Sequence, residues 1–129
     1  MKLKTLLLTG LAGIALTACT TTPKTPTLEL GVLEKVTNID VYPNTKSNKA
    51  QLVKFPDHCI IEFSAVIEAG RANEKWQFKG NNLISASSTI FAKDGTSTGE
   101  AFDLYDKQKQ DSFIALKNNF KKENIAACE

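Results

Sequence analysis

From residue 28 onward, short runs of alternating hydrophobic and polar residues follow one another along the chain. A period of two is the pattern of a strand with one buried face. The first runs cover 28–32 and 39–41, with a break in phase between them, and both are predicted to be strands. After a polar loop that reaches residue 48, the run 51–55 predicts an edge strand that Pro56 ends.

The strongest strand pattern lies in the middle of the chain, at residues 59–67, where every second side chain is apolar. A turn separates this run from the next one, 75–79, and the two together predict an antiparallel hairpin. A second turn leads into the run 83–92, which predicts a further strand. In this strand we expect Leu83 on the face opposite Ala86.

The end of the chain changes to a helical period. Residues 101–105 follow a loop rich in Gly, Thr and Ser, and they fit either one more strand or the lead-in to a helix. From Asp106, a residue suited to cap a helix, hydrophobic residues recur three and four apart at Phe113, Leu116 and Phe120. The whole pattern predicts an α+β fold, with an antiparallel sheet of about five strands and a C-terminal helix packed on one face.

The first 18 residues have the composition of an export signal. Two lysines at positions 2 and 4 precede an apolar stretch at 6–16, which would cover roughly half of a bilayer's hydrocarbon core and is too short to span it. The signal ends in Leu16-Thr17-Ala18-Cys19, which resembles the lipobox of bacterial lipoproteins.

This resemblance implies that Cys19 receives diacylglycerol, that signal peptidase II cleaves before it, and that the freed amine is acylated. The protein would then be held in the cell envelope by lipid, and Thr20 in place of an Asp implies the outer membrane. Residues 19–27 are polar and proline-containing and are expected to tether a single domain at 28–129. The alternative is an ordinary signal peptide cut elsewhere, with Cys19 an incidental thiol.

Charge and length limit the classes of function. The chain has 129 residues, which fits one domain, and its 16 basic residues include two in the export signal. Removal of that signal leaves 14 basic residues against 14 acidic ones. A chain with balanced charge has no overall field that attracts nucleic acid, so a nucleic-acid partner is not expected.

Two cysteines remain after Cys19, and export places them in an oxidising compartment. We therefore predict a disulfide between Cys59 and Cys128. Two free buried thiols are an alternative, as is a metal site that uses His58 beside Cys59. A zinc site usually needs four Cys or His ligands, whereas the mature chain offers one His and these two Cys, so no metal or other cofactor is expected.

The sequence carries no pattern of an enzyme nucleophile and no glycine-rich phosphate loop, so catalysis is not expected. His58 could act as a base, but an exposed or structural role is the simpler interpretation. The acid pair Asp103 and Asp106 fits solvated surface groups better than a catalytic pair.

Three features bear on binding, and each has a plain structural alternative. Trp76 and Phe78 could form an aromatic platform, although paired aromatic residues on an alternating strand usually belong to the core. The last helix carries lysines that could contact anionic lipid head groups or phosphorylated glycans, or could be simply solvated, at positions 107, 117, 121 and 122. The hydroxyls of Ser85, Ser87, Ser88 and Thr89 suit an exposed sheet face or a surface that pairs with another protein.

Three functional hypotheses follow from these observations. The first is a small binding module of the cell envelope that recognises a protein or envelope component, in the manner of inhibitor, immunity or accessory-subunit lipoproteins. The second is a structural or assembly scaffold at the membrane. The third is an envelope hydrolase that uses His58.

The lipoprotein hypothesis predicts the mass of the mature protein. The intact mass of protein extracted from membranes is expected to equal the chain from Cys19 to Glu129 plus acyl chains. Two cysteines are expected to react with an alkylating agent only after reduction. An unacylated chain that begins at another residue would disprove the anchor.

Overall fold

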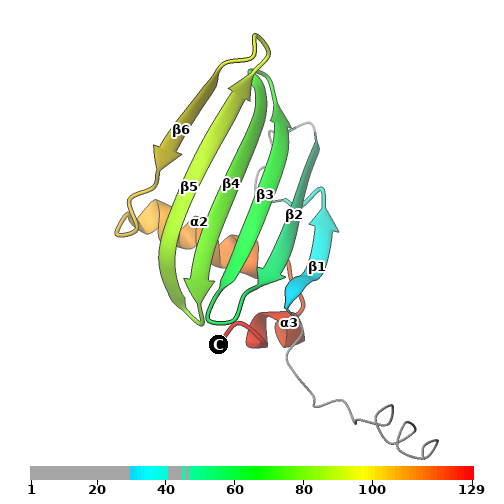
Figure 1. Cartoon of the computed structure of the whole chain (residues 1–129), viewed down its shortest axis with the longest axis vertical. Helices are drawn as coiled ribbons and strands as arrows, with labels where there is room; N and C mark the ends of the chain where they lie inside the picture. Colours follow the sequence, from blue (N-terminus) through cyan, green and yellow to red (C-terminus); the bar gives the residue numbers. More distant parts are fainter. Residues whose placement is uncertain (1–29, 41–44, 46) are drawn as a thin grey trace, which may run out of the picture.

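The computed structural model describes residues 30–40, 45 and 47–129, and within them the chain forms six strands and two helices (Figure 1). The strands are β1 (Gly31–Thr37), β2 (Ser47–Lys54), β3 (Cys59–Ile67), β4 (Gly70–Lys79), β5 (Asn82–Ala92) and β6 (Ser97–Ala101). The helices are α2 (Lys107–Lys117) and α3 (Lys122–Ala126).

The six strands form one antiparallel sheet in the order of the sequence, so each strand pairs with the next along the chain. Such a meander needs only tight turns, and glycines with positive φ lie at two of them, Gly70 at the start of β4 and Gly80 after its end. The α+β class predicted from the sequence is confirmed. The sheet has six strands in the described part of the chain rather than about five.

The first two strands differ from the sequence prediction. Residue 39 is not in a strand, because Asn38 adopts a positive φ of 52° and turns the chain after β1. Ile39 is instead buried, and its backbone N–H and C=O both bond to the side chain of Asn48, at 2.7 and 3.1 Å. Residues 28 and 41, which belonged to predicted strands, lie outside the described residues.

Strand β2 also starts earlier than predicted and is not an edge strand. It begins at Ser47, inside the expected loop, and lies between β1 and β3. Its first residues are polar, but Asn48 is buried because its amide satisfies the turn at Ile39. The start of β2 was not predicted because the prediction relied on alternating apolar residues, whereas the buried residue at this position is polar and hydrogen-bonded.

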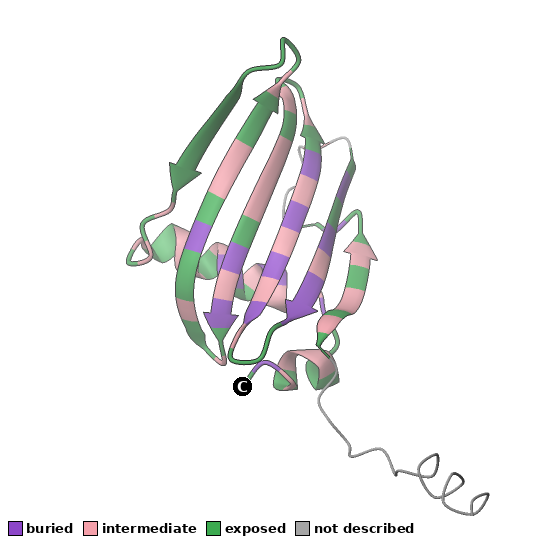
Figure 2. Cartoon of the chain, viewed as in Figure 1, coloured by how far each residue is buried: buried purple, intermediate pink, exposed green. Residues whose placement is uncertain are grey.

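Strand β6 was missed, because Ser97–Ala101 lies in the segment expected to be a Gly, Thr and Ser loop. All five of its residues are exposed (Figure 2). Because none of them is buried, the strand needs no alternating hydrophobic residues that the sequence would show. Residues 102–105 then form a turn rather than a strand. The predicted helix cap is confirmed, since the Asp106 carboxylate accepts a hydrogen bond from the N–H of Gln108 at 3.0 Å.

One face of the sheet, called the inner face here, carries the buried side chains of the strands. Trp76 and Phe78 are fully buried there, which confirms that they are core residues and not a binding platform. The ring of Phe113 from α2 lies 5.1 Å from the ring of Phe78 and 6.3 Å from that of Trp76. Leu116 and Phe120 belong to the same buried cluster.

Leu83 also contacts this cluster, contrary to the prediction that it lies on the face opposite Ala86. The register of β4 and β5 shifts between Gln77 and Phe78, so that Phe78 lies opposite Leu83. An extra residue in one strand makes every side chain beyond it point to the opposite face of the sheet. Ile84 is consequently 46% exposed.

Cys59 and Cys128 form the predicted disulfide, with their Cα atoms 5.6 Å apart. Both residues are buried, so the crosslink joins the start of β3 to the chain's penultimate residue inside the core. The backbone N–H of Gly80 also donates to the carbonyl oxygen of Cys128 at 2.8 Å. The tail that follows α3 is therefore fastened to two strands.

Edge strand β1 is fastened to α3 through Glu34. One carboxylate oxygen of Glu34 accepts hydrogen bonds from the backbone N–H of Lys121 at 2.9 Å and from the side-chain amide of Asn124 at 2.8 Å. Lys121 is the residue just before the first turn of α3, where free N–H groups and the helix dipole favour a carboxylate.

Replacing both Cys59 and Cys128 by Ser is expected to lower the free energy of unfolding by about 4 kcal/mol, since the crosslink closes a loop across a separation of 69 residues. Urea unfolding followed by Trp76 fluorescence measures the change. Unreduced wild-type protein is the control, because it retains the crosslink. Equal unfolding midpoints for the double variant and the control would contradict the prediction.

Replacing Glu34 by Ala is expected to cost about 1–2 kcal/mol of unfolding free energy, because two donors at the start of α3 lose their acceptor. Glu34→Gln retains a side-chain oxygen and is expected to lose less than half as much. The comparison is made by thermal unfolding of the two variants and wild type. A Gln variant as unstable as the Ala variant would show that these hydrogen bonds do not hold α3.

Candidate functional site

The face of the sheet opposite the buried cluster, called the outer face here, carries two rows of polar side chains. Strand register aligns Lys35, Gln51, Glu62 and Lys75 across β1 to β4. The neighbouring row contains Thr37, Lys49, Ser64 and Asn73, again one residue from each strand. The rows lie side by side because residues two apart on a strand share a face.

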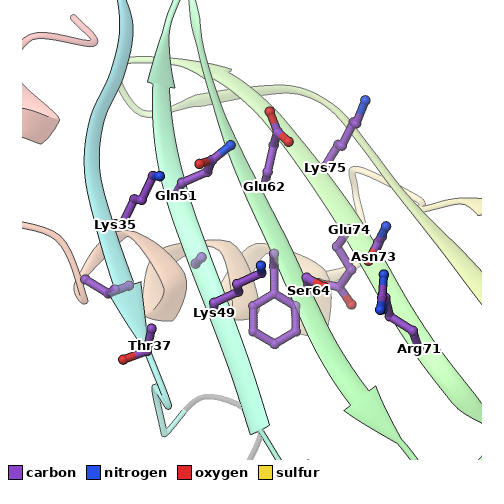
Figure 3. Close-up of a pocket in the computed structure, with 13 residues that line it drawn as sticks. Lys35, Thr37, Lys49, Gln51, Glu62, Ser64, Arg71, Asn73, Glu74 and Lys75 are labelled. Atoms are coloured by element: carbon purple, nitrogen blue, oxygen red, sulfur yellow. The ribbon is translucent and has the colours of Figure 1, made fainter.

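A hollow of about 380 Å³ lies over these rows and is called the outer hollow here. Figure 3 shows the labelled side chains that line it, which are those of the two rows together with Arg71 and Glu74. A second hollow of about 490 Å³ is partly lined by the same residues, Thr37, Lys49, Ser64 and Arg71. The two hollows thus form one concave region over the first four strands.

The outer hollow is rich in positive charge. The side chains of Lys35, Lys49, Arg71 and Lys75 are exposed around it, and none of these side chains has a hydrogen bond or ion pair with another residue of the described chain. Glu62 is the acidic side chain between them on this face. Glu74 also lines the hollow, but its carboxylate lies on the Trp76 side of the sheet and accepts a hydrogen bond from Trp76 Nε1 at 3.0 Å.

Asn73 adds an unsatisfied acceptor to the lining. Its side-chain oxygen is buried and has no hydrogen-bond donor among the described residues. Leaving such an atom without a donor costs roughly 1–3 kcal/mol. The hollow thus combines unpaired cations with acceptors that need hydrogen-bond donors.

His58, the predicted candidate base, lies in the turn between β2 and β3. Its Nδ1 is 2.6 Å from a carboxylate oxygen of Asp57, and this hydrogen bond, together with charge attraction, lowers the pKa of Asp57. The His58 ring stacks on Phe55 with centroids 4.9 Å apart. The structure therefore brings His58 together with Asp57 and Phe55, and none of these side chains lines the outer hollow.

The acid pair Asp103 and Asp106 has local structural roles. The Asp103 carboxylate accepts a hydrogen bond from the backbone N–H of Tyr105 at 2.9 Å, while Asp106 caps α2. Each carboxylate thus stabilises its own turn of backbone.

The helical lysines are not gathered into one basic face. Lys107 pairs with Asp111 at 2.9 Å, whereas Lys117 Nζ donates to the Gly80 carbonyl and to Asn81 Oδ1, both at 3.2 Å. Lys117 also lies over the rings of Phe78 and Phe113, and burial lowers its pKa. Lys121 and Lys122 are exposed at the start of α3.

The predicted hydroxyl run divides between the two faces. Ser85, Ser87 and Thr89 follow Gln77, Lys75 and Asn73 across the outer face, and Ser88 points the other way. The hydroxyls of Ser87 and Thr89 thus extend the two rows of the outer hollow onto β5.

Cys19, the predicted lipid attachment, lies outside the described residues, as do the export signal and the tether. Within the part of the chain that the structure describes, no helix is long and apolar enough to cross a membrane. The same part contains no group of three or more His, Cys, Asp or Glu side chains that could hold a metal ion.

No protein-family model, curated protein or solved structure matches this chain. The outer hollow was not identified from the sequence, because its four cations come from three separate strands and meet only through strand register. The available signal was weak: of these four cations, Lys75 alone occupies a polar position of a predicted alternating run.

Proposed function

We propose that this protein is a binding module of the bacterial cell envelope, anchored by lipid at Cys19, and that its outer face contacts the partner. The observation that carries the proposal is the outer hollow, where four unpaired cations surround one outward carboxylate. Four of the 14 basic residues that follow the predicted export signal lie around this hollow. Charge of one sign on a concave face attracts and orients a partner of opposite charge.

The arrangement of layers supports the same face. In this proposal α2 covers the inner face of the sheet, where Phe113 and Leu116 join the buried cluster. The outer face then stays open to solvent and can contact a partner without any rearrangement of the core. Leu30, the first described residue of the domain, follows Cys19 by eleven positions, which allows a tether of at most about 40 Å.

The hydrolase hypothesis has less support. His58 contacts Asp57 and Phe55 on an exposed turn, away from the lining of the outer hollow. The scaffold hypothesis would use the edge of the sheet instead of its face, and the exposed strand β6 is the surface it predicts.

Photo-crosslinking in the native bacterium can test which surface contacts the partner. A photoreactive residue is placed at Thr37 or Ser87, on two sides of the outer hollow, in the full lipidated protein. Controls of similar exposure carry it at Ser97 on β6 or Gln108 on α2. The proposal expects adducts with another component from Thr37 and Ser87 and few from the controls.

Two outcomes would overturn this proposal. Adducts between copies of the protein from Ser97 alone would indicate a scaffold that assembles through β6. Adducts from Gln108 alone would place the binding surface on the helix. Charge reversal by Lys49→Glu is expected to reduce the adducts from Ser87, whereas Lys93→Glu, an exposed lysine of the β5–β6 turn, is expected to leave them unchanged.

A further inference from the structure

We propose that the outer hollow binds an anionic saccharide, a sugar chain that carries carboxylate or phosphate groups beside free hydroxyls. The proposal rests on the proposed function and adds the chemical class of the ligand. It is built from two properties of the lining: the spread of its cations, and the acceptors that lie between them.

The cations are spread too widely to suggest a single small ion. Lys35 and Lys75 share a row but stand three strands apart, roughly 14 Å between Cα atoms at the usual strand spacing. Arg71 and Lys75 are four residues apart on β4, roughly 13 Å. This spread matches a ligand with anionic groups on successive units, each held by a charge-assisted hydrogen bond.

The middle of the hollow requires hydrogen-bond donors. Glu62 lies between Gln51 and Lys75 in its row, and an ionised carboxylate only accepts hydrogen bonds. The buried oxygen of Asn73, in the adjacent row, is a second acceptor without a donor among the described residues. A ligand with only anionic oxygens would repel Glu62, whereas sugar hydroxyls would donate hydrogen bonds to it.

An acidic peptide fits this arrangement less well. A peptide lying on the face of a sheet presents alternate side chains to it, and its backbone N–H groups point along the sheet. Acidic side chains would then meet Glu62 directly. Apolar ligands are also disfavoured, because the one aromatic residue of the lining, Phe63, is buried on the inner face.

The experiment measures binding of the detergent-solubilised, acylated protein to four probes at one ionic strength. Oligogalacturonate carries carboxylates, phosphomannan carries phosphates, dextran is an uncharged saccharide, and polyglutamate is an acidic peptide. Calorimetry or biolayer interferometry is expected to show binding of at least one anionic saccharide, with dextran and polyglutamate at least about tenfold weaker. The saccharide that binds more tightly identifies the anionic group.

Variants then locate the site. Lys49→Gln combined with Arg71→Gln is expected to weaken saccharide binding at least about tenfold, because two charge-assisted hydrogen bonds are lost. Lys93→Gln combined with Lys122→Gln is the matched control, since it removes the same charge from exposed positions outside the lining. Equal losses in the two double variants would overturn the proposed site.

Variants at Glu62 distinguish recognition of sugar hydroxyls from simple attraction between opposite charges. Glu62→Ala makes the hollow more positive, so a mere cationic patch would bind anions more tightly. If Glu62 accepts hydrogen bonds from sugar hydroxyls, the same variant binds severalfold more weakly, and Glu62→Gln, which keeps an oxygen acceptor, recovers part of the loss. Circular dichroism and thermal unfolding verify that each variant is folded.

Several results would overturn the inference. They are tighter binding by Glu62→Ala, polyglutamate binding equal to that of the saccharides, or no binding of any probe. The last result leaves the proposed function standing if Thr37 and Ser87 still form crosslinks with a partner. If those crosslinks are also absent, both proposals fail.

Discussion

Phe113 of α2 meets the two largest buried side chains of the sheet, Trp76 and Phe78, and this aromatic contact is the constraint on which the other layers depend. A six-stranded antiparallel sheet has two broad faces, and the buried cluster that includes Phe113 lies against one of them. The face that meets the aromatic cluster becomes the core. The other face must be polar enough to remain in water.

That requirement explains why the outer face can carry function without cost to stability. Residues of the outer face, such as Lys35 and Lys75, need only keep that face soluble. The choice of side chain at these positions is therefore free to serve recognition of a partner. The crosslink between Cys59 and Cys128 and the Glu34 contact with α3 stabilise the other side of the molecule. In the proposed function, folding and recognition would therefore use different residues of the same strands, on opposite faces.

The sequence pattern predicted the elements whose residues are buried. The hairpin of β3 and β4, the core positions Trp76 and Phe78, and the Asp106 cap all leave a clear periodic or local signal. Strand β6 left none, because hydrogen bonds to β5 hold it while no side chain is buried. The reversal at Leu83 was hidden for another reason, since a register shift depends on the partner strand.

The outer hollow could not be predicted for the same reason, because it also depends on how the strands pair. Its residues are up to 40 positions apart, from Lys35 to Lys75, and only strand pairing brings them together. No periodicity within one strand reports on the charge of its neighbours. The disulfide was predictable because the predicted export and the number of cysteines restrict the choice, whereas surface chemistry has no such restriction.

The position of β1 has a mechanical consequence. In the proposed anchored form, the lipid is attached through the tether that precedes β1, which is an edge strand, and a bound partner would hold the sheet through β1 to β4. Tension between membrane and partner would pass first through the hydrogen bonds of β1 with β2, and through the bonds of Glu34 to α3. The aromatic core, three strands further in, would carry load only after these hydrogen bonds had broken.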